Sequence, residues 1–400
     1  MKNNNTEIWM LKIMLQILET VAFASITIFI GFYLFYLAIC VRYIRKKHVS
    51  KSARTQSMSK DLPKVSIIIP TYNEAPVIPR KMENLQALHY PKDKLEIIFT
   101  DGGSTDRTAE IVENLAKDSR LSVIIVQQGR RKGFNDAVRE GFAKSTGEII
   151  SITGAETEYD PEALSIMVEK FSDPRIGAVT GKQKIKNIGE GYSPKLEVAY
   201  RSLYDFIREA ESYIDSPFDI KGEICAARRD IIAHLAGKPE LSEKGCIDCC
   251  ISFQAKMDGY KTTYEPQAVY YELSPKTIKD SFKQQIRRAA TLIENMMAFK
   301  GMILNKFGAF GILIMPAHFL MLIILPFLFL LGSIGIVMVT ILNPSNYLAL
   351  FLIGITILAM LLSRQLQAFL KTQIVLVVAT LKLVIGVETQ KFERLSTTRP

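Results

Sequence analysis

Four clusters of acids, glycines and cations follow four short apolar runs in the middle of the chain. The clusters lie at residues 70–74, 101–106, 129–133 and 154–157. Carboxylates bind divalent cations or accept protons, glycines let the backbone approach a ligand closely, and Arg and Lys bind phosphate oxygens. This combination indicates a binding site for a phosphorylated ligand, with or without a metal ion.

The apolar runs and the segments between them predict how these clusters are positioned. The runs are rich in β-branched residues, and segments with helical periodicity separate them. The runs are 65–69, 95–100, 122–126 and 148–153, and the helical segments include 108–117 and 135–143. This alternation predicts an α/β fold with a mostly parallel sheet and helices on both faces. Ligands of such sheets bind beyond the carboxyl ends of the strands, where the four clusters lie.

Three acids near these strand ends differ in the role that we expect. Asp101 ends a buried run, where an acid is costly unless it is used, and it is placed to accept a hydrogen bond from a pyrimidine. Asp106 is either a ligand residue or the cap of the helix that follows. Asp160 precedes Pro161, and we expect it to cap the next helix.

Three motifs resemble the nucleotide-binding motifs of family 2 glycosyltransferases. They are Pro-Thr-Tyr-Asn-Glu at 70–74, Asp-Gly-Gly-Ser-Thr-Asp at 101–106 and Lys-Gly-Phe-Asn-Asp-Ala at 132–137, in the family's order and about 30 residues apart. Three later segments also match: Gly222 with Arg228-Arg229, Cys-Ile-Asp at 246–248, and Gln-Gln-Ile-Arg-Arg at 284–288, where the family has Gln-x-x-Arg-Trp. The resemblance covers about residues 63–300 and extends to the membrane-integrated branch with hyaluronan, chitin and cellulose synthases.

The resemblance implies a GT-A fold and an inverting transferase that uses a nucleotide diphosphate sugar with Mg²⁺ or Mn²⁺. It implies that Asp248 is the general base on the acceptor hydroxyl. The residues that it places around the nucleotide-sugar are Thr71, Tyr72, Glu74, Asp101 and Lys132. The residues that it places beside the acceptor and diphosphate are Gln284, Arg287 and Arg288.

Two positions depart from the family pattern. Gly154 stands where the first carboxylate of the family's Asp-x-Asp motif is expected, so Glu156 is the remaining candidate metal ligand. Arg288 replaces the aromatic residue of the Gln-x-x-Arg-Trp motif, which leaves the acceptor class and processivity open.

Two uncharged stretches are long enough to cross a bilayer. Residues 20–41 contain 22 consecutive uncharged residues and residues 307–363 contain 57, whereas one span needs about 20. We therefore expect one span in the first stretch and two in the second, separated by Asn-Pro-Ser-Asn at 343–346. Seven basic residues and no acid lie in residues 42–60, which places that side in the cytoplasm by the positive-inside rule.

The predicted organisation has five parts along the chain. They are an N-terminal transmembrane helix (1–45), a basic linker (46–61), a cytoplasmic catalytic domain (62–275), an amphipathic interface helix (276–306) and a C-terminal transmembrane region (307–400). In the last part, we favour an interfacial position for residues 364–387 and keep a third C-terminal span as the alternative.

Charge and cysteine content restrict the partners. The net charge of +10 is concentrated beside the predicted spans, so the expected partner is the lipid bilayer and not a nucleic acid. Five cysteines, an odd number, favour a reduced compartment. The pattern Cys246-x-x-Cys249-Cys250 is compatible with zinc ligands or with buried structural thiols, and the second interpretation is favoured. His318 is expected to be a packed polar residue and not a ligand.

We therefore expect a cell-membrane glycosyltransferase that moves a sugar, from a UDP-sugar by preference, to a glycan or lipid-linked acceptor. Processive polysaccharide synthesis and single addition to a lipid carrier both remain open. A non-catalytic scaffold that has kept the GT-A fold is a rival, motivated by Gly154 and opposed by intact Asp101, Asp248 and Arg287. The oligomeric state is not specified by any sequence pattern.

Overall fold

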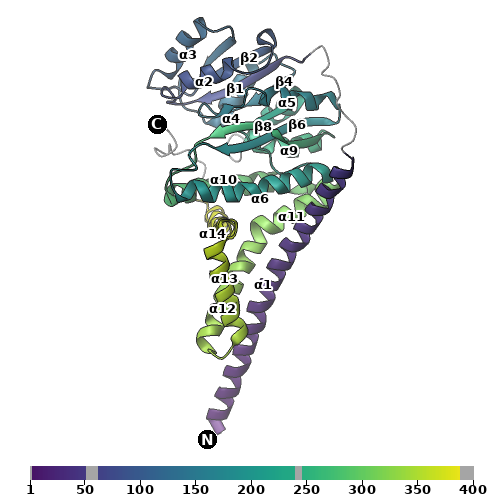
Figure 1. Ribbon diagram of the computed structural model, residues 1–400, viewed down its shortest axis with the longest axis vertical. Coiled ribbons are helices and arrows are strands. Elements are labelled where there is room, and N and C mark those ends of the chain that lie inside the picture. The colour runs from purple at the N-terminus through teal and green to yellow at the C-terminus, as the bar shows by residue number, and fades with distance from the viewer. Residues whose placement is uncertain (1, 51–61, 239–245, 388–400) are drawn as a thin grey trace.

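The computed structural model describes residues 2–50, 62–238 and 246–387. Figure 1 shows a sheet domain at one end and long helices that extend away from it. Helices α6 (Tyr192–Ile214) and α10 (Ile278–Ala298) lie crosswise between these two parts. The arrangement therefore has a sheet domain, a helical layer beneath it and a set of long apolar helices.

The sheet domain confirms the predicted α/β fold. One sheet of eight strands, in the order β3-β2-β1-β4-β7-β6-β8-β5, is formed by the described residues. The strands are β1 (Val65–Thr71), β2 (Leu95–Asp101), β3 (Ser122–Gln127), β4 (Ile149–Ile152), β5 (Glu158–Tyr159), β6 (Ile176–Ile185), β7 (Cys225–Arg228) and β8 (Lys261–Glu272). The pairs β1–β2, β1–β4, β2–β3 and β6–β8 are parallel, whereas β7 is antiparallel to both of its neighbours.

Helices cover both faces of the sheet because its central strands are apolar on both sides. Ile67 and Ile69 of β1 contribute to the core beneath α2, α3 and α5, while Ile68 faces the opposite core beneath α4, α7 and α9. The helices are α2 (Ile78–Gln86), α3 (Thr108–Lys117), α4 (Phe134–Lys144), α5 (Ala163–Glu169), α7 (Arg229–Ala236) and α9 (Ile247–Met257), with short 3₁₀ turns at Lys92–Lys94, Lys170–Ser172 and Lys300–Met302.

The antiparallel strand β7 determines which loops meet at the edge of the sheet. Ile152, the last residue of β4, pairs with Cys225, the first residue of β7. The loop that follows β4 therefore lies beside the loop that precedes β7. Residues 153–157 and 219–224 share one edge, which is also the edge where β1 and β2 end.

Among the residues that the structure describes, three helical segments are long and apolar enough to cross a membrane. They are Trp9–Lys46 within α1 (Lys2–Ser50), the run Phe310–Leu342, and α14 (Arg364–Ile385). The second run contains two π-helical turns, Phe310–Ile314 and Leu320–Ile324, with α11 (Met315–Phe319) between them and α12 (Leu325–Leu342) after them. A shorter apolar helix, α13 (Tyr347–Leu362), follows the turn at residues 343–346.

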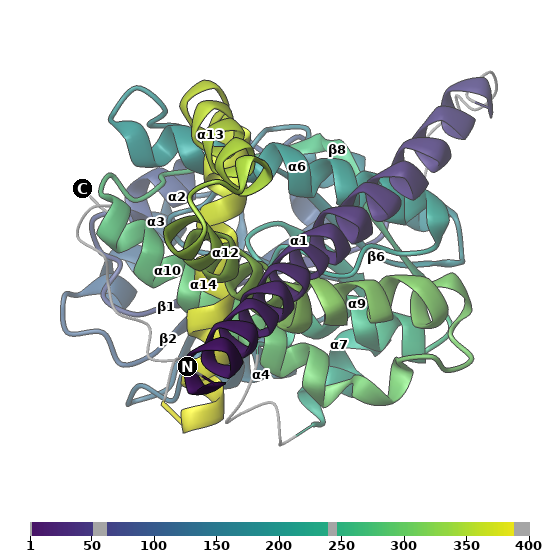
Figure 2. The same ribbon diagram turned by 90° about the horizontal axis from the view of Figure 1, so that it is seen from below.

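Helix α14 runs across the direction of α1 and α12. Figure 1 shows α14 nearly end-on while α1 and α12 run down the picture, and Figure 2 shows α14 along its length. It packs beneath α6 and α10, and Lys371 donates a 2.8 Å hydrogen bond to Ser281 of α10. Its length would allow a span, but its direction is that of a helix lying along the layer formed by α6 and α10.

A buried acid joins the long helices to the sheet domain. Glu211 of α6 accepts hydrogen bonds from the Tyr36 hydroxyl of α1 (2.6 Å) and the Phe218 backbone N–H (2.9 Å). It also pairs with His318 Nε2 of α11 at 2.6 Å, and the His318 ring stacks on Phe218 at 4.0 Å. His318 is therefore a packed member of a polar network, as expected from the sequence.

Candidate active site

The ends of β1 and β2 hold two of the predicted nucleotide-binding residues side by side. Thr71 and Asp101 are register partners, and both side chains are buried. The Asp101 carboxylate accepts hydrogen bonds from the backbone N–H groups of Gly103 (3.1 Å) and Ser104 (2.9 Å). It also accepts from the hydroxyls of Ser104 (2.5 Å) and Thr71 (3.4 Å). The Thr71 hydroxyl lies equally close to the Thr100 carbonyl (3.4 Å), so it can donate there and leave an acceptor position of Asp101 for a nucleobase.

The loops around Asp101 are closely packed against one another. Gly103 has φ +79°, and a Cβ atom there would lie 3.1 Å from the Cα of Arg130. Asn73 has φ 55°, and its side-chain oxygen accepts a hydrogen bond from the Thr105 backbone N–H. Asp106 accepts from the backbone N–H groups of Ala75 (3.1 Å) and Thr108 (3.2 Å). Asp106 therefore links the two predicted nucleotide loops in addition to its role at the start of α3.

The basic residues of the third motif point to different partners. The Arg131 guanidinium lies over the Tyr72 ring, 4.4 Å from the ring centroid. Lys132 is exposed, and its ammonium pairs with Glu140 of α4 at 2.8 Å. Arg131 thus lies at the predicted nucleoside pocket, within the basic run 130–132 that the sequence predicts to contact phosphate at this edge. Glu74 is buried, and its backbone N–H donates to the hydroxyl of Thr108.

The loop after β4 carries the altered Asp-x-Asp motif. A Cβ atom on Gly154 would lie only 2.9 Å from Oε2 of Glu156. The Glu156 carboxylate therefore occupies the space that a side chain at position 154 would need. Mg²⁺ in enzymes is commonly held by one or two carboxylates together with substrate phosphates. A single oxygen ligand from Glu156, supplemented by a diphosphate, fits a divalent cation at this loop.

A lysine buried beneath this loop was not predicted. Lys81 of α2 is 1% exposed and donates to the Thr157 carbonyl (2.7 Å) and the Thr153 hydroxyl (3.3 Å). Burial lowers its pKa to about 7, although the charge of Glu156 opposes the shift. The sequence did contain a signal, because Lys81 shares the buried helical stripe of Ile78, Met82 and Leu85.

The predicted general base lies at the first turn of α9. Asp248 Oδ1 accepts the Cys249 backbone N–H at 2.8 Å, and Oδ2 lies against Gly222, where a Cβ atom would be 1.4 Å away. Burial raises the pKa of Asp248, hydrogen bonds from Cys246 and Cys249 oppose the shift, and the charge of Glu223 adds to it. A carboxylate with a raised pKa is a better proton acceptor, which suits a general base.

The two arginines predicted to lie beside the acceptor face the acids of this edge. Arg288 pairs with Glu223 (3.1 Å), Glu272 (3.5 Å) and Glu197 (3.9 Å). These acids raise the pKa of Arg288, against the opposing effect of burial. Arg288 is therefore already neutralised by carboxylates. Burial and the neighbouring Arg288 lower the pKa of Arg287, which interacts with Cys246, Glu223 and Asp248.

Two further acids at this edge were not predicted from the sequence. Burial raises the pKa of Glu272, at the end of β8, to about 7, and the nearby Glu223 adds to the shift. Arg288 lowers the pKa of Glu223 against the effect of its burial. Gln284 is half-buried on the same helix as the two arginines.

The remaining motif arginines lie away from the site. Arg228 donates to the carbonyls of Ile176 and Phe171, and Arg229 donates to those of Ser145 and Gly147. Both therefore bind the backbone at the far end of β7. Gly222, Arg228 and Arg229 form the segment that resembles the family's acceptor-side segment. Of these three residues, Gly222 contacts the site, at Asp248.

Comparisons with known proteins agree with this geometry. A sequence model described as Glycosyl transferase family 2 matches residues 66–235. The chain is 26% identical over 265 residues to the poly-beta-1,6-N-acetyl-D-glucosamine synthase of Staphylococcus epidermidis. The aligned residues make up 66% of this chain and 62% of the relative. It is also 26% identical over 270 residues to the enzyme of that name from Staphylococcus aureus (strain COL), covering 67% and 62%. The chain thus spans about three fifths of the length of these curated relatives.

A solved structure resembles a larger part of the chain. The mannosyltransferase of Pyrobaculum calidifontis, in complex with GDP-Man and Mn²⁺, superposes with a TM-score of 0.77 at 26% identity. The superposition covers 93% of this chain and 100% of that structure, so it includes helices outside the sheet domain. Residues 66–235 of this chain therefore match the family 2 glycosyl transferase model, on a fold like that of the mannosyltransferase, and they are joined to helices long and apolar enough to cross a membrane.

Proposed function

We propose that this protein is a membrane-bound inverting glycosyltransferase that moves a sugar from a nucleotide diphosphate sugar to a hydroxyl of a membrane-presented acceptor. The observation that carries the proposal is the meeting of two features at one sheet edge. The family's nucleotide loops end β1 and β2, and the Asp248 carboxylate lies beside the loop before β7 at the same edge. The relatives named above are sugar-transferring or polysaccharide-forming enzymes, which supports the same reaction class.

Asp248 is the proton acceptor in the proposed reaction. Its carboxylate takes the proton from the acceptor hydroxyl while that oxygen forms a bond to the anomeric carbon. The bond from the anomeric carbon to the diphosphate breaks on the opposite side, and the nucleotide diphosphate leaves with the electron pair. A single displacement of this kind inverts the anomeric configuration and needs one base, which Asp248 supplies.

The remaining residues bind and orient the donor. Tyr72 and Arg131 form a stacked pair at the proposed nucleoside pocket, together with Thr71, Asp101 and Glu74. Arg287 lies close enough to Asp248 to interact with it, and it is placed to balance charge on the diphosphate. A Mg²⁺ or Mn²⁺ ion bound through Glu156 would neutralise further charge on the leaving diphosphate.

The donor base remains part of the proposal. We favour a UDP-sugar on the family resemblance, and the structural neighbour bound to GDP-Man makes a GDP-sugar the alternative. Stacking on the Tyr72 ring would suit either base, because every base has a π-face, and a base on the face that Arg131 covers would displace that guanidinium. A donor panel distinguishes the two.

The long helices α1 and α12 pack closely against each other. A Cβ atom on Gly335 of α12 would lie 2.6 Å from the Cβ of Ala22 in α1, and Gly332 meets Ile26 similarly closely. Such contact between small residues leaves no lumen between these two helices. We propose that α1, α12 and α13 anchor the domain, that α14 lies in the interface, and that the basic residues after α1 place the domain in the cytoplasm.

Release of nucleotide diphosphate by the detergent-purified protein tests the proposed function. UDP-, GDP- and dTDP-sugars are compared with Mg²⁺, with Mn²⁺ and with chelator, and membrane lipids are supplied as acceptor. We expect metal-dependent release from one donor class and its loss in Glu156→Ala. Donor binding without release from any donor, after lipid-linked acceptors have been tried, would favour a non-catalytic GT-A protein.

A further inference from the structure

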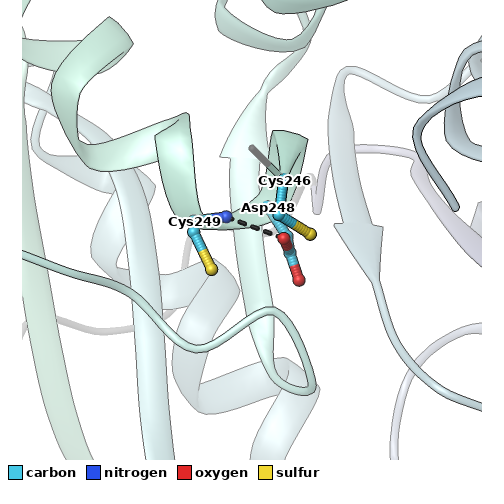
Figure 3. Close-up of side chains that lie close together, drawn as sticks. All are labelled: Cys246, Asp248 and Cys249. Carbon is cyan, nitrogen blue, oxygen red and sulfur yellow. Dashed lines mark hydrogen bonds between the residues drawn. The ribbon is translucent and has the colours of Figure 1, made fainter. Parts of the chain in front are cut away.

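Two thiols flank the proposed base. Cys246 is the N-cap residue of α9, and Asp248 and Cys249 follow in its first turn. The two sulfur atoms and a carboxylate oxygen of Asp248 all lie within 4.8 Å of one another. All three residues are half-buried, and Figure 3 shows their side chains gathered at the start of the helix. The cluster thus reaches solvent while its atoms are fixed by the helix.

These three groups form a donor set for a thiophilic cation. Zn²⁺ binds Cys sulfur at about 2.3 Å and carboxylate oxygen at about 2.1 Å, often with three protein ligands and one open position. Two sulfur atoms on one tetrahedral zinc are therefore about 3.8 Å apart. The present atoms lie within 4.8 Å of one another, so side-chain movements of about 1 Å would bring them to those distances. The Cys249 N–H bond to Asp248 Oδ1 would orient the carboxylate in the manner of outer-shell partners.

The local charge also suits a divalent cation. Two thiolates and one carboxylate carry three negative charges, which a divalent cation reduces to one. Arg287 interacts electrostatically with both Cys246 and Asp248, and its charge balances the remainder. The third cysteine of the pattern, Cys250, is fully buried in the apolar core and is not part of the cluster.

We propose that Cys246, Asp248 and Cys249 form a binding site for Zn²⁺, and that Zn²⁺ bound there occupies the base and stops sugar transfer. The second half of this proposal depends on the proposed function, whereas the binding does not. Sulfur ligands distinguish this site from the oxygen site at Glu156, which suits Mg²⁺ or Mn²⁺.

Equilibrium dialysis of the full chain against Zn²⁺ tests the binding, with a phosphine reductant present to keep the thiols reduced. Co²⁺ serves as a second probe, because thiolate coordination produces a charge-transfer absorption. We expect one bound equivalent and a thiolate signal, both lost in Cys246→Ser and in Cys249→Ser and both retained in Cys250→Ala. Circular dichroism verifies that each variant is folded. Equal Zn²⁺ binding by the wild type and a folded Cys246→Ser/Cys249→Ser variant would overturn the site.

Nucleotide diphosphate release tests the consequence of binding. Each protein is assayed with Mg²⁺, with and without equimolar Zn²⁺, and the ratio of the two rates is compared. We expect a loss of at least tenfold in the wild type and in Cys250→Ala, and a ratio near one in the double cysteine variant. Equal inhibition of all three would place the effect of Zn²⁺ elsewhere and overturn the proposal. If the wild type releases no nucleotide from any donor, the proposed function fails, and dialysis still decides the cation site.

Discussion

A Cβ atom on Gly222 would lie 1.4 Å from Oδ2 of Asp248. Glycine is therefore the residue that lets the proposed base lie against the loop before β7. No positive φ is involved at Gly222, so the requirement is for space and not for backbone conformation. The two residues lie in separate segments of the chain, and their contact restricts the position of the Asp248 carboxylate.

Gly222→Ala is expected to reduce sugar transfer about 100-fold or more, because an added methyl group displaces the Asp248 carboxylate and a shift of about 1 Å has effects of that size. Kinetics of nucleotide diphosphate release measure the change, and thermal unfolding verifies that the domain remains folded. Gly189→Ala is the matched control, since a Cβ atom there meets nothing within 4 Å. Comparable losses in the two variants would disprove the role of the Gly222 contact.

The fall in rate on the acid side of the pH–rate profile should reflect protonation of the Asp248 carboxylate. Its pKa is raised, so the active carboxylate is lost as pH falls through a value above that of an ordinary aspartate. Glu223→Gln removes a negative charge that contributes to the shift, so the acid limb should move to lower pH. Measurement of kcat/KM against pH for the two proteins decides the point. An acid limb that stays in place or moves upward would show that Asp248 does not control it.

Lys81 should make stability depend on pH above neutrality. Its pKa in the fold is about 7, while an unfolded lysine has a pKa of ~10.4. Between these values the unfolded chain binds the extra proton, so this group makes the free energy of unfolding rise with pH by up to ~1.4 kcal/mol per unit.

Lys81→Met removes this dependence, so the wild type should gain stability relative to the variant as pH rises from about 7 to about 9. Apparent melting temperatures across this range provide the measurement, and Lys144→Met, at an exposed position of α4, serves as the control. Parallel curves for the wild type and Lys81→Met would mean that Lys81 has an ordinary pKa.

Gly154→Asp restores the first carboxylate of the family's Asp-x-Asp motif but should lower activity. The new Cβ atom would lie 2.9 Å from Glu156 Oε2 and would push that carboxylate aside. We expect a loss of about tenfold in metal-dependent release, equivalent to ~1.4 kcal/mol in the activation free energy, because the displaced carboxylate no longer positions the cation. The variant Gly154→Asp/Glu156→Asp shortens the obstructing side chain and should regain activity. Higher activity in Gly154→Asp alone would refute the proposed steric conflict.

Much of the sheet could be predicted from local patterns. Continuous β-branched runs such as 65–69 predict buried parallel strands, and the structure has β1 there. The motif at 246–248 predicts Asp248 as the base, and that role stays a prediction. Contacts between distant segments could not be predicted in the same way. The Gly222–Asp248 contact joins the loop before β7 to α9, and the Arg131–Tyr72 pair joins two loops 59 positions apart along the chain.

Lys81 is an intermediate case. Its helical spacing with Ile78 and Met82 predicts that Lys81 lies on the buried face of α2. Its residue type alone predicts the opposite, because lysine side chains are rarely buried. Its burial is tolerated because the Thr157 carbonyl and the Thr153 hydroxyl accept its hydrogen bonds, and those partners lie more than 70 positions away in sequence. Lys132 is the opposite case. Its motif predicts a contact with the nucleotide, whereas in the folded chain its ammonium forms an ion pair with Glu140.

Donor binding and turnover of Asp248→Asn, measured together in one detergent preparation, test the central claim most directly. The substitution keeps the shape of the side chain and removes its ability to take a proton. We predict that donor affinity in titration calorimetry is essentially unchanged, while nucleotide diphosphate release falls by about 10² to 10⁴, the usual contribution of a general base. Release by Asp248→Asn at the wild-type rate would contradict the assignment of Asp248 as the base.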